Sequence, residues 1–239
     1  MLSYRPWKLD SAFRLLLALV GGFGLLGLAA YAADNFITGV PKERLRLLIS
    51  VLGTLIYQGV SVVLIQKFLQ ENELTWGGAF GFRKAGLGRS LGVAAVMALL
   101  VFPANLTLMK VSQQILEWRA IKAVPQEAVE ALRTSQSVTD VALLAVLALL
   151  TAPVLEELLY RGILYPSIKQ AGFPRIAFWG TALLFAAAHV NTVTFVPLVF
   201  FALMQTLLYE YTDNLMAPML SHSLFNSANF LWVMLDRAS

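Results

Sequence analysis

The sequence predicts an all-α protein, a polytopic bundle of about seven (six to eight) transmembrane helices. Of its 239 residues, 58% are hydrophobic and only 13% are charged, and the mean hydropathy is +0.70. A soluble domain carries about 25% charged residues, so this chain lacks the residues for a water-facing shell. Helices of about 20 residues that span a bilayer suit the length instead. We expect one transmembrane domain over residues 1–239, in a multi-pass protein of the cell (plasma) membrane.

Apolar runs separated by polar stretches mark the expected helices. Seven such segments can be delimited, at residues 13–33, 45–68, 90–110, 139–165, 175–190, 193–210 and 215–235. At the first of them, Arg5, Lys8 and Arg14 precede an apolar run from Leu15 to Ala33 that contains Ala30-Tyr31-Ala32, as in a secretory signal peptide. Its apolar run is longer than the roughly 7–15 residues of a signal peptide core, so we interpret it as the first transmembrane helix.

The longest polar stretch lies between the third and fourth segments, at about residues 111–138. Its helical periodicity and mixed charge favour a surface helix pair beside the membrane. Such an element either gates the entry of a substrate or simply connects two helices. We prefer the connector, because amphipathic connectors are common in membrane proteins.

Net charge and cysteine usage exclude several classes of function. The net charge is +4 and the pI is about 9.4, but the basic residues are spread over the loops and form no stripe. Loop cations of this kind set topology or contact lipid head groups, so no nucleic-acid partner is expected. The chain has no cysteine. Disulfides, cysteine-ligated zinc and a thiol nucleophile are therefore ruled out.

A few ionisable residues lie inside the apolar segments, where they are costly. Glu156 and Glu157 follow the apolar run Val141–Leu150. A charge at the centre of a bilayer costs at least about 2.5–3.5 kcal/mol on insertion scales. Two adjacent carboxylates at this depth indicate a structural pair or a functional site.

Both histidines of the chain also lie in apolar segments. His189 lies near the end of the fifth segment, whereas His222 lies in the seventh, four residues before Asn226. Residues four apart share one face of a helix, and a polar face in a membrane must look into the bundle. Taken singly, each histidine could be a core residue, and His222 with Asn226 could hold helices together. Their occurrence together on separate helices favours one functional site within residues 140–235, the motif-bearing core.

Spacing separates the expected roles of the two glutamates. Glu157 and Arg161 are four residues apart, the geometry of an ion pair along a helix. Glu156 is rotated by about 100° around the helix and has Tyr160, not a cation, at the matching position. Glu156 is therefore the carboxylate that is freer to take up a proton.

Three motifs in this order resemble those of the CAAX-processing and bacteriocin-processing family of intramembrane proteases, relatives of the type II CAAX prenyl endopeptidase. The motifs are Glu156-Glu157-x-x-x-Arg161-Gly162, Phe185-x-x-x-His189 and His222-x-x-x-Asn226. The resemblance covers about residues 140–235, and relatives often have eight helices. It implies hydrolysis of a peptide bond within the membrane.

The resemblance also implies a role for each of the motif residues. Glu156 and His189 would activate the attacking water, and His222 and Asn226 would stabilise the oxyanion. The pair of Glu157 and Arg161 would support the site. A carboxylate with an imidazole is a workable general base, and an imidazole with an amide can supply donors to an oxyanion.

The sequence leaves the use of a metal and the class of function open. Glu156, His189 and His222 could form a His₂Glu zinc site, but the HExxH pattern is absent and a metal-free mechanism is favoured. The expected partners are the lipid bilayer and a membrane-tethered protein or peptide substrate. The alternatives are a proton-coupled transporter, since such proteins also use intramembrane Glu and His, and a non-catalytic scaffold or immunity protein.

A simple hairpin of the fourth and fifth segments raises one geometric difficulty. Glu156 would lie near the end of one helix and His189 near the end of the other, so their depths would differ by roughly 10 Å at 1.5 Å per residue. Either a tilt of the helices or a fourth helix that extends beyond Tyr165 would remove the difference.

Overall fold

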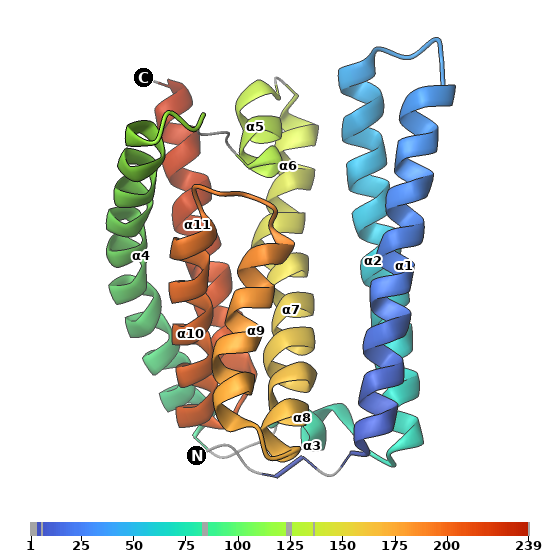
Figure 1. The fold of residues 1–239 in the computed structure, drawn as a ribbon, viewed down its shortest axis with the longest axis vertical. Helices are drawn as coiled ribbons and strands as arrows, with labels where there is room; N and C mark the ends of the chain where they lie inside the picture. The colour runs from blue at the N-terminus through green and yellow to red at the C-terminus, as the bar shows by residue number, and fades with distance from the viewer. Residues whose placement is uncertain (1–3, 6, 83–85, 123–125, 136, 239) are drawn as a thin grey trace. The chain divides into compact units, whose positions relative to one another are not determined.

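The computed structural model describes residues 4–5, 7–82, 86–122, 126–135 and 137–238, and within these ranges all regular structure is helical (Figure 1). Their contacts divide the chain into two compact units, residues 6–75 and residues 1–5 with 76–239. The polar stretch 111–138 was expected to be helical and contains α5 (Glu127–Thr134), while its residues 123–125 and 136 lie outside the described ranges. An all-α fold is confirmed.

The unit of residues 6–75 is a hairpin of two long helices, α1 (Leu9–Phe36) and α2 (Lys42–Glu71). At one end, the Asn72 side chain accepts a hydrogen bond from the Lys8 amide at 2.9 Å and donates one to the Ser11 hydroxyl at 3.0 Å. At the other end, the Arg46 guanidinium pairs with Asp34 at 3.2 Å. Polar links thus close both ends of an otherwise apolar hairpin.

The second unit is a bundle built from α4 (Leu87–Trp118), α9 (Pro174–Ala188), α10 (Phe195–Thr212), α11 (Met216–Ala238) and one long composite helix. That composite helix runs from Val138 to Gln170. Its parts are α6 (Val138–Val146), α7 (Ala152–Glu157) and α8 (Tyr165–Gln170), joined by the π-helical stretches η1 (Leu147–Thr151) and η2 (Leu158–Leu164). A short helix, α3 (Trp76–Phe80), precedes α4.

By length and composition, five helical segments in the described ranges are suited to crossing a membrane: α1, α2, α4, the composite helix and α10. The predicted number of seven is not confirmed by this measure. The helix α9 has 15 residues, and α11 falls short because it carries a series of Ser, His and Asn side chains. All seven predicted apolar segments nevertheless coincide with helices.

The core of the bundle lies where α4, α9, α10 and α11 meet. Buried side chains from all four helices form one cluster, namely Val101, Ala182, Phe185, Phe201, Ala202, Leu203 and Phe225. Alanines at the helix interfaces let the backbones approach closely, as is usual between helices in membranes. The site residues of α9 and α11 are attached to this cluster.

A tight corner sets the start of α11. Asp213 ends α10 with a positive φ of 49°, and its carboxylate accepts a hydrogen bond from buried Arg5 at 2.7 Å. The same guanidinium donates to the Tyr209 hydroxyl at 2.8 Å. The Leu215 amide then donates to the Phe80 carbonyl at 3.0 Å, which fastens α3 to the corner.

Gly162 shows why the first motif ends in glycine. A Cβ at this position would lie 3.0 Å from Phe80 Cε1 and 3.1 Å from Leu215 Cδ2. We expect Gly162→Ala to lower the free energy of unfolding by about 1–3 kcal/mol, because it overpacks this contact. Thermal unfolding in detergent measures the loss. Gly180→Ala is the matched control, since its nearest neighbour would be Ile176 Cγ2 at an ordinary 3.6 Å, and equal stability losses in both variants would contradict the explanation.

Candidate active site

Two π-helical stretches flank the glutamate pair at the end of α7. Each ends two residues before a proline, η1 at Thr151 before Pro153 and η2 at Leu164 before Pro166. Proline cannot donate a backbone hydrogen bond and clashes with the carbonyl four residues earlier, so it favours a wider turn upstream. Such π-helical turns are rare and frequently occur at functional sites.

Glu156 and His189 lie at similar depth in the bundle. The composite helix continues past Tyr165 to Gln170, and α9 starts at Pro174 and runs back. Glu156 is 14 residues before Gln170, and His189 is 15 residues after Pro174. Both are therefore roughly 22 Å from the turn at 1.5 Å per residue, which removes the difference in depth that a shorter helix would have created.

The predicted ion pair between Glu157 and Arg161 is confirmed. Arg161 Nη1 donates to Glu157 Oε1 at 3.0 Å, and both side chains are almost completely buried. Arg161 Nη2 also donates to the Ala202 carbonyl at 3.1 Å. The guanidinium carbon lies 4.7 Å from the centre of the Phe185 ring. A buried cation with these partners meets the requirement that intramembrane charges be paired.

His222 joins the two glutamates. Its Nδ1 is 2.8 Å from Glu157 Oε1, and its Nε2 is 3.8 Å from Glu156 Oε2. A carboxylate accepts hydrogen bonds, so Nδ1 carries a hydrogen and Nε2 is the atom that faces Glu156. The ring of His222 is itself buried and packs against Phe201 at 4.8 Å between ring centres. Glu157 thus fixes the orientation of an imidazole whose other nitrogen points toward the more accessible carboxylate.

His189 is connected to this group through Phe185. The His189 Nδ1 lies 2.8 Å from the Phe185 carbonyl oxygen, so this nitrogen donates. The Phe185 ring lies 4.8 Å from the His189 ring and 6.0 Å from the His222 ring, between centres. Within the described part of the chain, His189 makes no hydrogen bond to Glu156, and its Nε2 has no hydrogen-bond partner.

Asn226 lies one turn after His222 on α11 and reaches the composite helix. Its Nδ2 donates to the Ala148 carbonyl, in η1, at 2.8 Å. This bond links the polar face of α11 to the π-helical stretch before the glutamates. The amide has a second N–H that this bond does not use.

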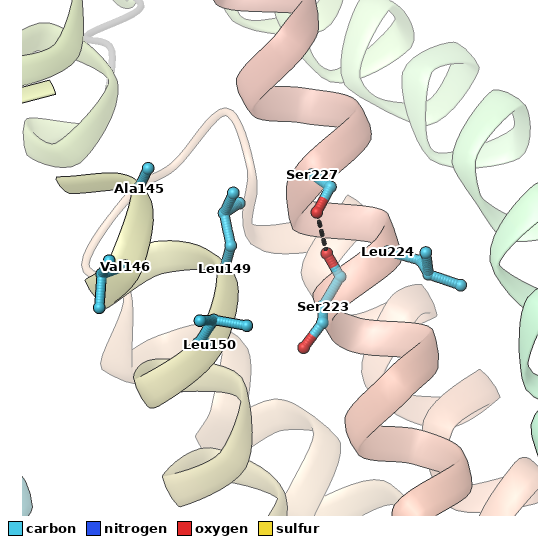
Figure 2. Close-up of a pocket in the computed structure, with 7 residues that line it drawn as sticks. All are labelled: Ala145, Val146, Leu149, Leu150, Ser223, Leu224 and Ser227. Atoms are coloured by element: carbon cyan, nitrogen blue, oxygen red, sulfur yellow. Dashed lines mark hydrogen bonds between the residues drawn. The ribbon is translucent and has the colours of Figure 1, made fainter. Parts of the chain in front are cut away.

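An apolar groove of about 270 Å³ lies between the composite helix and α11. Figure 2 shows its lining, which consists of Ala145, Val146, Leu149, Leu150, Ser223, Leu224 and Ser227. The Ser227 hydroxyl donates to the Ser223 carbonyl at 2.7 Å. Ser223 and Ser227 directly follow His222 and Asn226 in the sequence, so the groove borders the polar face of α11.

The side chains considered as alternative zinc ligands do not form a ligand set. Among the residues that the structure describes, no three His, Cys, Asp or Glu side chains gather closely enough to hold a metal ion. Glu156 and His222 are neighbours, whereas His189 follows the last residue of α9 and is bonded to the Phe185 carbonyl. These residues do not fit a His₂Glu site in this arrangement.

Several groups that hold the site together do not stand out in the sequence. Phe185 is only one position of a motif there, yet its ring contacts both histidines and Arg161. The carbonyls of Ala148 and Ala202 are backbone acceptors that no side-chain pattern reveals. For the Ala148 carbonyl, the sequence contains one indication, Pro153. A proline inside an apolar helix leaves a carbonyl of the preceding turn without its backbone donor.

Comparison with known proteins relates the segment that carries these residues to a family. Residues 138–228 match the family described as "Type II CAAX prenyl endopeptidase Rce1-like". Searches of curated proteins and of solved structures found no match. The matched segment holds the composite helix, α9, α10 and the motif-bearing part of α11. Together with the five apolar segments, it indicates a multi-pass membrane protein. The resemblance inferred from the motifs is thus confirmed over residues 138–228, the segment that matches this Rce1-like family.

Proposed function

We propose that this protein is an intramembrane endopeptidase of the cell membrane that cleaves a membrane-associated protein or peptide with a water activated by Glu156, without a metal. The observation that carries the proposal is the arrangement of His222. One ring nitrogen lies 2.8 Å from buried Glu157, and the other lies 3.8 Å from Glu156. A free carboxylate next to an oriented imidazole is the arrangement that acid–base hydrolysis needs.

Glu156 is the general base in this proposal. Its side chain is 29% exposed, whereas that of Glu157 is fully buried and bonded to Arg161. Glu156 takes a proton from water as the water oxygen attacks the peptide carbonyl. It then gives that proton to the amine nitrogen as the peptide bond breaks. His189 assists by accepting a hydrogen bond from the same water at Nε2, because its Nδ1 donates to the Phe185 carbonyl.

His222 and Asn226 are the oxyanion donors. Since Nδ1–H of His222 is bonded to Glu157, the ring donates to the oxyanion from Nε2, the nitrogen that faces Glu156, when both nitrogens carry a hydrogen. The second N–H of Asn226 is the other donor. Removing one donor to an oxyanion typically costs about a hundredfold in rate.

A comparison of membrane proteomes tests the function and identifies the substrate in the same experiment. New peptide termini are mapped by mass spectrometry in membranes of cells that express the wild-type chain, Glu156→Ala or His189→Ala. We expect termini that occur only with the wild type. Identical termini in all three samples would reject the protease and favour the transporter or scaffold. The same cleavage by purified protein should survive exhaustive chelation, and its loss with recovery on adding Zn²⁺ would replace the metal-free mechanism.

We further expect the substrate to approach along the groove beside α11. Leu150 lines this groove and is 58% exposed, so Leu150→Trp should fill it without disturbing the core. The KM should rise about tenfold while kcat changes little, since the loss is one of apolar contact. Leu143→Trp, on the same composite helix but outside the groove, is the control. Equal KM values for both variants would contradict this path.

A further inference from the structure

One carbonyl of the composite helix has lost its normal backbone donor. The Ala152 amide donates to the Leu147 carbonyl, five residues earlier, as in a π-helix. The next residue is Pro153, which has no N–H. The Ala148 carbonyl is therefore bonded neither by Ala152, its donor in an α-helix, nor by residue 153, its donor in a π-helix.

Asn226 supplies the missing hydrogen bond from 78 positions away in the sequence. Its Nδ2 lies 2.8 Å from the Ala148 oxygen. A carbonyl without a donor is costly inside a membrane, so this bond is strongly favoured. It also restrains the amide, because one N–H is held by Ala148 and the direction of the second N–H is then fixed.

We infer that Pro153 is a positioning residue for Asn226. By removing a backbone N–H, Pro153 keeps the Ala148 carbonyl available as the acceptor that orients the Asn226 amide. Donors to an oxyanion act through such preorganisation, since a donor that must first rotate into place contributes less to the rate. The inference rests on the proposed role of Asn226 as an oxyanion donor.

Pro153→Ala tests the inference, because it restores the N–H and a regular helix can then bond the Ala148 carbonyl. We expect kcat to fall about tenfold with little change in KM, a part of the hundredfold that loss of a donor costs. The melting temperature in detergent should not fall, since alanine suits a helix interior better than proline. Loss of activity without loss of stability separates positioning from a merely structural role.

A double-mutant cycle and a matched proline complete the experiment. Asn226→Ala should cost about a hundredfold in the wild-type background and clearly less in the Pro153→Ala background, because the amide is already misplaced there. Pro166→Ala is the control, since Pro166 also follows a π-helical stretch by two residues but frees no acceptor for Asn226. Its kcat should stay at the wild-type value.

The outcomes separate the inference from the proposed function. The positioning role would be overturned by a wild-type kcat for Pro153→Ala, or by an equal loss of kcat for Asn226→Ala in both backgrounds. Neither result would contradict the proposed protease function. A wild-type kcat for Asn226→Ala itself would remove both the oxyanion role and the inference that depends on it.

Discussion

Glu156→Gln is expected to lower the rate of peptide cleavage by about 10²–10⁴-fold, the range that a positioned general base contributes. The amide keeps the size of the side chain but cannot accept a proton from water. Because Glu156 is partly exposed and no Lys or Arg of the described residues pairs with it, the substitution leaves no buried charge behind. Folding should therefore be retained.

Purified variants in detergent provide the measurement, with single-turnover cleavage of a substrate identified from the membrane proteome. Glu130→Gln, an exposed glutamate of α5, is the control for a generic loss of charge. A rate for Glu156→Gln within twofold of that for Glu130→Gln would show that Glu156 is not the base.

Arg161→Ala is expected to cause the largest loss of stability in the molecule, about 3–5 kcal/mol. The substitution removes the cation from Glu157, whose side chain is fully buried, and leaves that carboxylate bonded to His222. It also removes the donor to the Ala202 carbonyl and the contact with the Phe185 ring. Thermal unfolding in detergent measures the change.

Two further variants show whether the buried charge is the cause. Glu157→Gln combined with Arg161→Met removes both charges and should recover much of the stability. Its cleavage should remain slow, because His222 loses the carboxylate that orients its ring. Arg133→Ala breaks an exposed pair with Asp236 and should change stability little. A melting temperature for Arg161→Ala equal to that of Arg133→Ala would contradict the account.

Most of the fold could be predicted from the sequence, because a membrane restricts the backbone structures that can cross it. Long apolar runs must be helical, and each of the seven predicted segments coincides with a helix. The fourth segment was predicted to end at residue 165, five residues before the end of the composite helix at Gln170. In the structure, the wider π-helical turns of η2 precede Pro166 and accommodate it, so the helix continues to Gln170.

The candidate site was predictable where its contacts are local. Glu157 and Arg161 are four residues apart, so helical periodicity alone predicted their ion pair. The bond between His222 and Glu157 joins residues 65 positions apart, and that between Asn226 and Ala148 depends on a backbone carbonyl. Neither follows from periodicity, because both depend on how α11 packs against the composite helix.

Cleavage in ¹⁸O-labelled water tests the central claim most directly, namely that Glu156 activates water within a site completed by His222. Purified wild-type protein should produce a new carboxyl terminus that carries one ¹⁸O, and Glu156→Gln should produce almost none in the same time. Labelled product formed at equal rates by both proteins would contradict the claim.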